Sequence, residues 1–212
     1  MTTGGERMIN LVLALKSEAK PLIEHFKLAE TVTDTGARLF EGSGLSLVIG
    51  GIGKTAATAA VTTLSVRSSP QEEQVWINLG LAGHRTHEVG RAFLAHSVED
   101  AQSGEIWRPR PIVDADLPTV AVQTVERPEL DYPEDCLYDM EASAFMAAVS
   151  RRPYADLIQV MKIVSDNRKR PTRQLTAQLA VRLVRQQLPA IERLISEIRL
   201  RSISGGDDGN VS

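Results

Sequence analysis

One stretch of the chain organises the rest of it: Asp139-Met140-Glu141-Ala142-Ser143-Ala144-Phe145. It reads as the start of a helix over residues 142–149, whose small apolar side chains allow close packing against a sheet. Glu141 is expected in the first turn, where the partial positive charge of the helix N-terminus favours an ionised carboxylate. A carboxylate beside such an apolar face indicates a binding residue. The alternative is an acid that serves only the start of the helix.

A second segment completes the candidate site. Residues 157–164 are predicted to form a largely buried strand, and Ser165, Asp166 and Asn167 follow at its C-terminal end. Ligand sites in open α/β sheets form at the carboxyl ends of the strands. We therefore interpret Asp166 as a site residue. The alternative is an acid that caps the segment following the strand.

The composition is that of an ordinary soluble globular chain. Of the 212 residues, 42% are hydrophobic and 24% are charged, and the formal net charge of -3 gives no reason to expect nucleic acid or a membrane as partner. The single cysteine, Cys136, excludes an internal disulfide. No apolar run reaches transmembrane length, and the first residues lack the apolar core of a signal peptide, so a cytoplasmic protein is predicted.

The alternation of strands and helices favours an α/β fold, a three-layer sandwich with a central mixed β-sheet. One domain is expected over residues 8–200, with a flexible extension at residues 1–7 and a disordered tail at residues 201–212. Ser17 is the expected N-cap of the first helix, and Pro189 should kink or divide the last one. The expected strands are residues 9–15, 38–41, 45–49, 75–79, 93–98, 119–124 and 157–164, and the expected helices are residues 17–27, 56–64, 142–149 and 172–199.

Two glycine-containing turns follow predicted strands. Residues 50–55 resemble a P-loop, but that motif needs its first glycine where this chain has Val48, so we interpret them as a tight turn that can present backbone N–H groups to an anion. At the end of the next strand, Ala82 and Gly83 are small enough to let a ligand approach the backbone. Both turns are therefore expected near the site.

Five blocks occur in an order that resembles the purine nucleoside phosphorylase and nucleosidase superfamily, with the greatest likeness to its 5′-methylthioadenosine/S-adenosylhomocysteine nucleosidases. The blocks are residues 14–18, 50–54, 78–83, 139–142 and 165–166. The resemblance implies a nucleoside phosphorylase/hydrolase-like fold, a homodimer and no cofactor. It also implies a site in which Glu141 binds the ribose hydroxyls, Met140 packs beneath the sugar, Asp166 protonates the purine at N7 with Ser165 orienting it, and Glu18 holds the attacking water. Ala82, Gly83 and Gln123 are further expected contacts of the substrate.

These roles agree with the chemistry that the residue types permit. Breaking an N-glycosidic bond builds positive charge on the sugar and negative charge on the base, so an acid at the base and a carboxylate near the sugar both act in the transition state. Asp166 must carry a proton when it acts. Glu18, at a helix start, is expected to stay ionised as the base. The predicted function is hydrolysis of a purine nucleoside, a 5′-modified adenosine.

Three departures from the family pattern keep alternatives open. Phosphorylases carry glycine and arginine where this chain has residues 15–18, which favours water as the nucleophile, and Leu81 replaces a small hydroxyl residue. The segment between Gly90 and Asp139 is short and lacks an aromatic purine-binding strand, so residues 122–126, with Gln123, are the expected substitute. Shortened members of the superfamily include enzymes for adenosyl groups on bulky partners, such as the adenosylhopane nucleosidase group. The alternatives are a phosphate-dependent phosphorylase and a nucleoside-binding protein without turnover.

Several other residues have two interpretations. Arg85 and the run Arg168-Lys169-Arg170 are either solvated or contact an anion, and the run is alternatively a lid over the site. Trp107 and Tyr138 either stack on a base or pack in the core or an interface. His84 and His87 have no cysteine or acid at metal-ligand spacing, so loop histidines are expected rather than a metal site.

Overall fold

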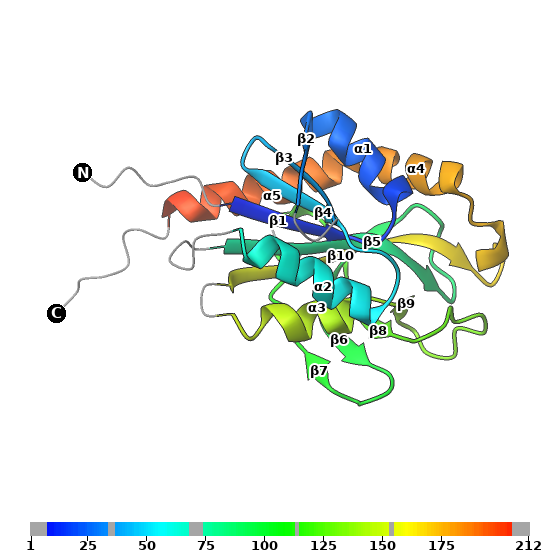
Figure 1. Ribbon diagram of the computed structural model, residues 1–212. Helices are drawn as coiled ribbons and strands as arrows, with labels where there is room; N and C mark the ends of the chain where they lie inside the picture. Colours follow the sequence, from blue (N-terminus) through cyan, green and yellow to red (C-terminus); the bar gives the residue numbers. More distant parts are fainter. Residues whose placement is uncertain (1–7, 34–36, 68–73, 113–114, 153–154, 205–212) are drawn as a thin grey trace, which may run out of the picture.

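A mixed β-sheet runs through the centre of the molecule, and helices cover both of its faces (Figure 1). The computed structural model describes residues 8–33, 37–67, 74–112, 115–152 and 155–204. This architecture confirms the predicted α/β fold with a central mixed sheet. The strands are β1 (Met8–Leu13), β2 (Ala29–Thr31), β3 (Arg38–Gly42), β4 (Leu45–Ile49), β5 (Gln74–His84), β6 (Ala92–Asp100), β7 (Ile106–Trp107), β8 (Thr119–Thr124), β9 (Leu137–Asp139) and β10 (Ala155–Asn167).

Five of the strands form a closed ring of pairings. Strand β10 pairs in parallel with β5 and antiparallel with β6. From β6 the ring continues through the parallel pairs β6–β8 and β8–β9, and the antiparallel pair β9–β5 closes it. Beyond β5 the sheet is open and runs through β1, β4, β3 and β2. Strand β5 belongs to both the ring and the open sheet, so the two parts of the sheet are joined along this strand.

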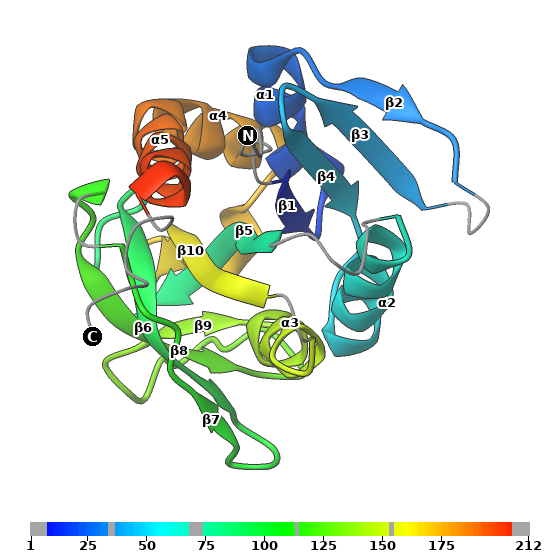
Figure 2. The same cartoon turned by 90° about the vertical axis from the view of Figure 1, so that its left-hand side faces the viewer.

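The central strands are apolar on both sides because helices cover both sides. In β1, Leu11 belongs to the core cluster that includes Leu22 of α1 and Ile191 of α5. The next residue, Val12, belongs to the opposite cluster, which includes Phe145 of α3. Figure 2 shows α1, α4 and α5 on one side of β1, β5 and β10 and α2 and α3 on the other. The helices are α1 (Lys16–Phe26), α2 (Lys54–Ser65), α3 (Ala142–Val149), the 3-10 helix η2 (Thr172–Gln174), α4 (Ala177–Gln186) and α5 (Leu188–Ser204).

The strands expected at residues 38–41 and 45–49 are confirmed, and they form a hairpin. Strands β3 and β4 pair antiparallel with Gly42 opposite Leu45. The two turn residues, Ser43 and Gly44, have φ angles of 50° and 69°. Two successive positive φ angles are the geometry of the two-residue turn that matches the twist of paired strands.

Two helix boundaries differ from the sequence-based expectation. Ser17 lies inside α1, and the N-cap position belongs to Leu15. The reason is that Glu18 reaches back to accept a hydrogen bond from the Leu15 N–H at 2.9 Å, which caps the helix without a hydroxyl. At the other end, α5 extends to Ser204, into the segment predicted to be a tail. The division expected at Pro189 is confirmed, because α4 ends at Gln186 and Pro189 lies in the first turn of α5, where a proline is tolerated.

Other expectations concern segments outside the described residues. They are the flexible extension at residues 1–7 and most of the tail, at residues 205–212. Among the helices of the described ranges, none combines the length and the apolar character that crossing a membrane requires.

Candidate active site

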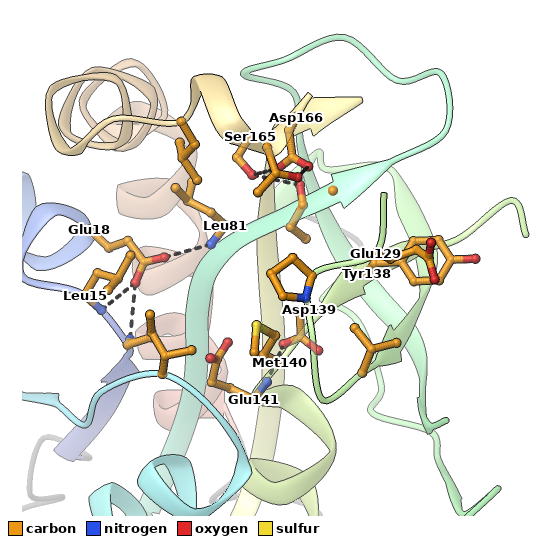
Figure 3. A pocket seen from close by; sticks show the side chains of 18 residues that line it. Leu15, Glu18, Leu81, Glu129, Tyr138, Asp139, Met140, Glu141, Ser165 and Asp166 are labelled. Carbon is orange, nitrogen blue, oxygen red and sulfur yellow. Dashed lines mark hydrogen bonds between the residues drawn. The ribbon is translucent and has the colours of Figure 1, made fainter. Parts of the chain in front are cut away.

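A cavity of about 210 Å³ lies where the carboxyl ends of β1, β5 and β10 meet the start of α3 (Figure 3). Parallel strands that end at one edge create such a crevice, and this is the usual place for a ligand in α/β sheets. The cavity brings together most of the residues that the sequence singled out. Its lining includes Glu18, Ala82, Gly83, Met140, Glu141, Ser165 and Asp166.

Glu18 is fixed by backbone donors. Its Oε2 accepts hydrogen bonds from the N–H groups of Ala14 at 3.2 Å and Leu15 at 2.9 Å, and its Oε1 accepts one from Leu81 at 3.1 Å. The side chain is buried, and this burial raises the pKa of Glu18 to about 7, against the opposing effects of the Leu15 N–H and of Lys162. The expectation of a carboxylate that is ionised throughout is therefore corrected: Glu18 exchanges its proton near neutral pH because burial outweighs the helix start.

Glu141 lies at the N-cap position of α3 rather than within its first turn, because the helix begins at Ala142. Its Oε1 accepts a hydrogen bond of 2.8 Å from the N–H of Gly53, in the glycine turn after β4. The anion that this turn binds is thus a side chain of the protein. Burial raises the pKa of Glu141, and the charge of Lys162 opposes the rise.

Lys162, which the sequence analysis did not single out, lies at the centre of these acids. Its side chain is 1% exposed, and its Nζ lies 2.7 Å from Oδ2 of Asp139. A Cβ placed on Gly80 would lie 3.5 Å from Oε1 of Glu18 and 3.6 Å from Lys162 Nζ, so both groups border the same glycine. We call Glu18, Asp139 and Glu141, together with Lys162, the carboxylate cluster. Lys162 could have been identified from the sequence as a lysine within a predicted buried strand, because a buried charge requires a partner.

Asp166 is surrounded by hydroxyl groups instead. Its Oδ1 accepts a hydrogen bond from Ser165, the contact that the predicted orienting role requires. Its Oδ2 accepts one from the Thr172 hydroxyl at 2.6 Å and another from the hydroxyl of Tyr132. We call Ser165, Tyr132 and Thr172, together with Asp166, the hydroxyl cluster. Sequence patterns did not single out Tyr132, which lies in a loop, or Thr172, which is the first residue of η2.

Gly83 makes the hydroxyl cluster sterically feasible. A Cβ at this position would lie 2.6 Å from Cε1 of Tyr132 and 2.9 Å from Oδ2 of Asp166. Both distances are shorter than van der Waals contact, so any larger residue would displace Tyr132 or Asp166. Gly83 was predicted to let a ligand approach the backbone, and in the structure the ring of Tyr132 lies at that position.

Of the other candidate residues, Tyr138 lines the cavity, whereas Gln123 and Trp107 do not. Gln123, predicted as a substrate contact, does not line this cavity and instead borders a separate hollow with Glu99 and Cys136. Trp107 also lies elsewhere, beside α3. Tyr138 does line the cavity, and its hydroxyl accepts a hydrogen bond of 2.8 Å from the N–H of Glu134.

The basic residues near the site contact the chain itself. Arg85 donates to the carbonyl of Tyr132 at 3.1 Å. Arg168 donates to the carbonyl of Asp131 at 2.7 Å and to that of Tyr132 at 3.3 Å. His84 and His87 stack with ring centroids 3.9 Å apart. Within the described ranges, no group of three or more histidine, cysteine or acidic side chains is placed to hold a metal ion.

The fold is that of the nucleoside phosphorylase and nucleosidase class, as comparison with solved structures shows. The 5′-methylthioadenosine/S-adenosylhomocysteine nucleosidase of S. pneumoniae has a TM-score of 0.72 at 17% identity, over 90% of this chain and 99% of that one. The corresponding nucleosidase of Helicobacter pylori has a TM-score of 0.75 at 12% identity, over 91% and 99%. The futalosine hydrolase of Helicobacter pylori has a TM-score of 0.74 at 13% identity, over 91% and 98%. No family model and no curated protein sequence matches the chain.

Proposed function

We propose that this chain is a hydrolase that cleaves the N-glycosidic bond of a purine nucleoside, and that its substrate is a 5′-modified adenosine. One observation carries the proposal: a single cavity places two differently built acid sites, the carboxylate cluster and the hydroxyl cluster, at opposite ends (Figure 3). The reaction requires such a pair, because charge of opposite sign develops on the sugar and on the base. The solved structures that share this fold include nucleosidases with purine-like ligands.

In this mechanism the carboxylate cluster binds the sugar and activates water. Glu141, held by the Gly53 N–H, accepts hydrogen bonds from the ribose hydroxyls, and Met140 packs beneath the ring. Glu18 accepts a proton from the attacking water. A pKa of about 7 suits this role, because general base catalysis is most efficient when the pKa of the base lies near the working pH.

Asp166, in the hydroxyl cluster, binds the base. Asp166 gives a proton to N7 as the glycosidic bond breaks, and Ser165 fixes the direction of its carboxyl group. Neutralising the leaving base in this way is general acid catalysis, which typically contributes a factor of about 10² to 10⁴ in rate.

The charge of the carboxylate cluster supports water rather than phosphate as the nucleophile. Three carboxyl groups, those of Glu18, Asp139 and Glu141, surround Lys162, and its ammonium group is already paired with Asp139. A phosphate dianion next to these acids would be repelled, whereas a neutral water would not. We therefore favour hydrolysis over phosphorolysis.

The experiment is chromatographic measurement of free purine released from adenosine, methylthioadenosine, adenosylhomocysteine, 5′-deoxyadenosine and inosine, with and without inorganic phosphate. The expected result is release of adenine that does not depend on phosphate and is fastest for a 5′-modified adenosine. Release only with phosphate, accompanied by a sugar 1-phosphate, would favour the phosphorylase instead. The proposal includes a cytoplasmic homodimer, and light scattering after gel filtration tests its oligomeric state.

A further inference from the structure

Tyr132 has a conformation that its position in a loop does not explain. Its side chain is almost completely buried, and its φ angle is 47°. A positive φ angle is a genuine outlier for a bulky residue, and such strain persists only where the surroundings impose it. The structure therefore contains contacts that hold Tyr132 in place.

These contacts hold both the backbone carbonyl and the side chain of Tyr132. At the backbone, the Tyr132 carbonyl accepts hydrogen bonds from Arg85 at 3.1 Å and Arg168 at 3.3 Å, and Arg168 also holds the carbonyl of Asp131 at 2.7 Å. At the other end, the hydroxyl donates to Oδ2 of Asp166 and the ring lies against Gly83. Burial and the contact with Asp166 raise the pKa of Tyr132 to about 12, so it remains a donor at neutral pH.

The place that Tyr132 fills is the place that the base needs. Asp166 has to offer a proton to a ring nitrogen, yet both of its oxygens already accept hydrogen bonds from hydroxyl groups. The cavity of about 210 Å³ is also smaller than the pockets of about 300–1,000 Å³ that typically hold a ligand. Of the three hydroxyl donors, Ser165 is fixed on β10 and Thr172 on η2, whereas Tyr132 is carried by a loop. Tyr132 is thus the donor that can leave.

We propose that Tyr132 is an internal substitute for the purine base: it occupies the base position on Asp166 in the free protein and is displaced when a purine binds, with Arg85 and Arg168 acting as the latch. This inference rests on the proposed function, because it assigns the base position from it. Tyr132 then determines specificity, since a base has to replace its hydrogen bond to Asp166 and its contact with Gly83. The apparent affinity for the base falls with the fraction of molecules in which Tyr132 holds the position.

The first test is calorimetric titration of the full chain with free adenine. Tyr132→Phe removes the hydroxyl but keeps the ring, and Arg168→Ala removes one of the two latch residues without touching the cavity. Because the closed form loses its hydrogen bond from Tyr132 to Asp166, we expect Tyr132→Phe to bind adenine about tenfold more tightly than the wild type. Arg168→Ala should shift the affinity in the same direction by a smaller factor. The matched control is Lys169→Ala, at the exposed neighbour of Arg168, which should leave the affinity unchanged.

A second measurement needs no variant. Hydrogen exchange of wild-type protein with and without adenine should show faster exchange in residues 129–134 when adenine is bound, because Tyr132 has left its place. Adenine that binds with the same affinity to wild type, Tyr132→Phe and Arg168→Ala, with unchanged exchange in this segment, would overturn the proposal while leaving the nucleosidase function intact. Conversely, adenine that displaces Tyr132 without any nucleoside being cleaved would support the proposal and contradict the function. Failure of the wild type and both variants to bind adenine overturns the proposal.

Discussion

The two ends of the cavity are built in different ways. Three members of the carboxylate cluster stand on regular elements, Glu18 on α1, Asp139 on β9 and Lys162 on β10. Glu141 is the N-cap residue of α3. Backbone N–H groups and one ion pair fix the cluster. The hydroxyl cluster is held by side-chain contacts, and one member, Tyr132, comes from a loop with a strained backbone. We infer that the carboxylate cluster is fixed before a ligand binds, whereas the hydroxyl cluster has to rearrange when a ligand binds. Four predictions test this difference.

The largest effect is expected from Glu18→Gln. The amide keeps the shape of the side chain but cannot take a proton from water, so turnover should fall by about 10² to 10⁴, the usual range for a lost general base. Binding of adenine should stay close to that of the wild type, because Glu18 belongs to the other end of the cavity. The check is steady-state purine release together with adenine titration. A variant that retains most of its turnover would remove Glu18 from the mechanism.

The next effect concerns stability. Lys162→Met leaves Asp139 buried without its cation, and breaking a buried pair in this way costs about 3–5 kcal/mol in the free energy of unfolding. The control is Lys20→Met, because Lys20 and Glu24 form an exposed pair at 3.8 Å, and such pairs contribute only about 0–1 kcal/mol. Urea denaturation measures both variants. Equal losses would mean that the carboxylate cluster does not depend on its lysine.

The pH dependence separates the two ends further. Glu18 acts only when ionised, so kcat/KM should rise about tenfold per pH unit below pH 7 and level off above its pKa of about 7. Stability should change in the opposite direction. Because the pKa is raised on folding, the protonated acid is favoured in the folded state, and the stability it contributes is full below pH 4.5 and is lost as the pH rises through 7. Glu18→Gln should lack this stability change, and a wild-type rate that does not vary between pH 5 and pH 7 would contradict the assignment.

The smallest effect compares two glycines on β5, one at each end of the cavity. Gly83→Ala places a Cβ 2.6 Å from Tyr132, and such overpacking typically costs about 1–3 kcal/mol. Gly80→Ala places its Cβ 3.5 Å from Glu18 and 3.6 Å from Lys162, which is ordinary contact, so it should cost less than about 1 kcal/mol. Thermal denaturation of both variants provides the measurement. A reversed order would show that the hydroxyl cluster adapts more easily than its packing indicates.

The sequence predicted the central mixed sheet and two of the four residues of the carboxylate cluster, Glu18 and Glu141, because these depend on periodic patterns and on glycine turns. Both of them line one cavity, together with Met140. Lys162 was missed because its neighbours in sequence are apolar, and its partner, Asp139, is distant in the chain. The raised pKa of Glu18 was also not predicted, since burial is a property of the folded molecule and not of a local stretch.

Two of the four residues of the hydroxyl cluster could be predicted from the sequence. Ser165 and Asp166 follow a strand and could be located from it, but Tyr132 reaches them from a segment 34 residues away with no regular structure. Gln123 was assigned to the site because its strand was predicted correctly, yet the position of a strand alone does not tell which hollow its side chains border. Loop contacts and the lining of a cavity are decided by tertiary packing, which a single sequence does not encode in local patterns.

We propose that Asp166 is the acid with which this cavity hydrolyses a purine nucleoside, and the rate of adenine release reports on that role. Adenine release from methylthioadenosine is followed without phosphate for the wild type, Asp166→Asn and the control Asp116→Asn, at an exposed acid paired with Arg193. We predict release by the wild type and the control, and at least about a hundredfold slower release by Asp166→Asn. Release at equal rates from all three proteins would contradict the account.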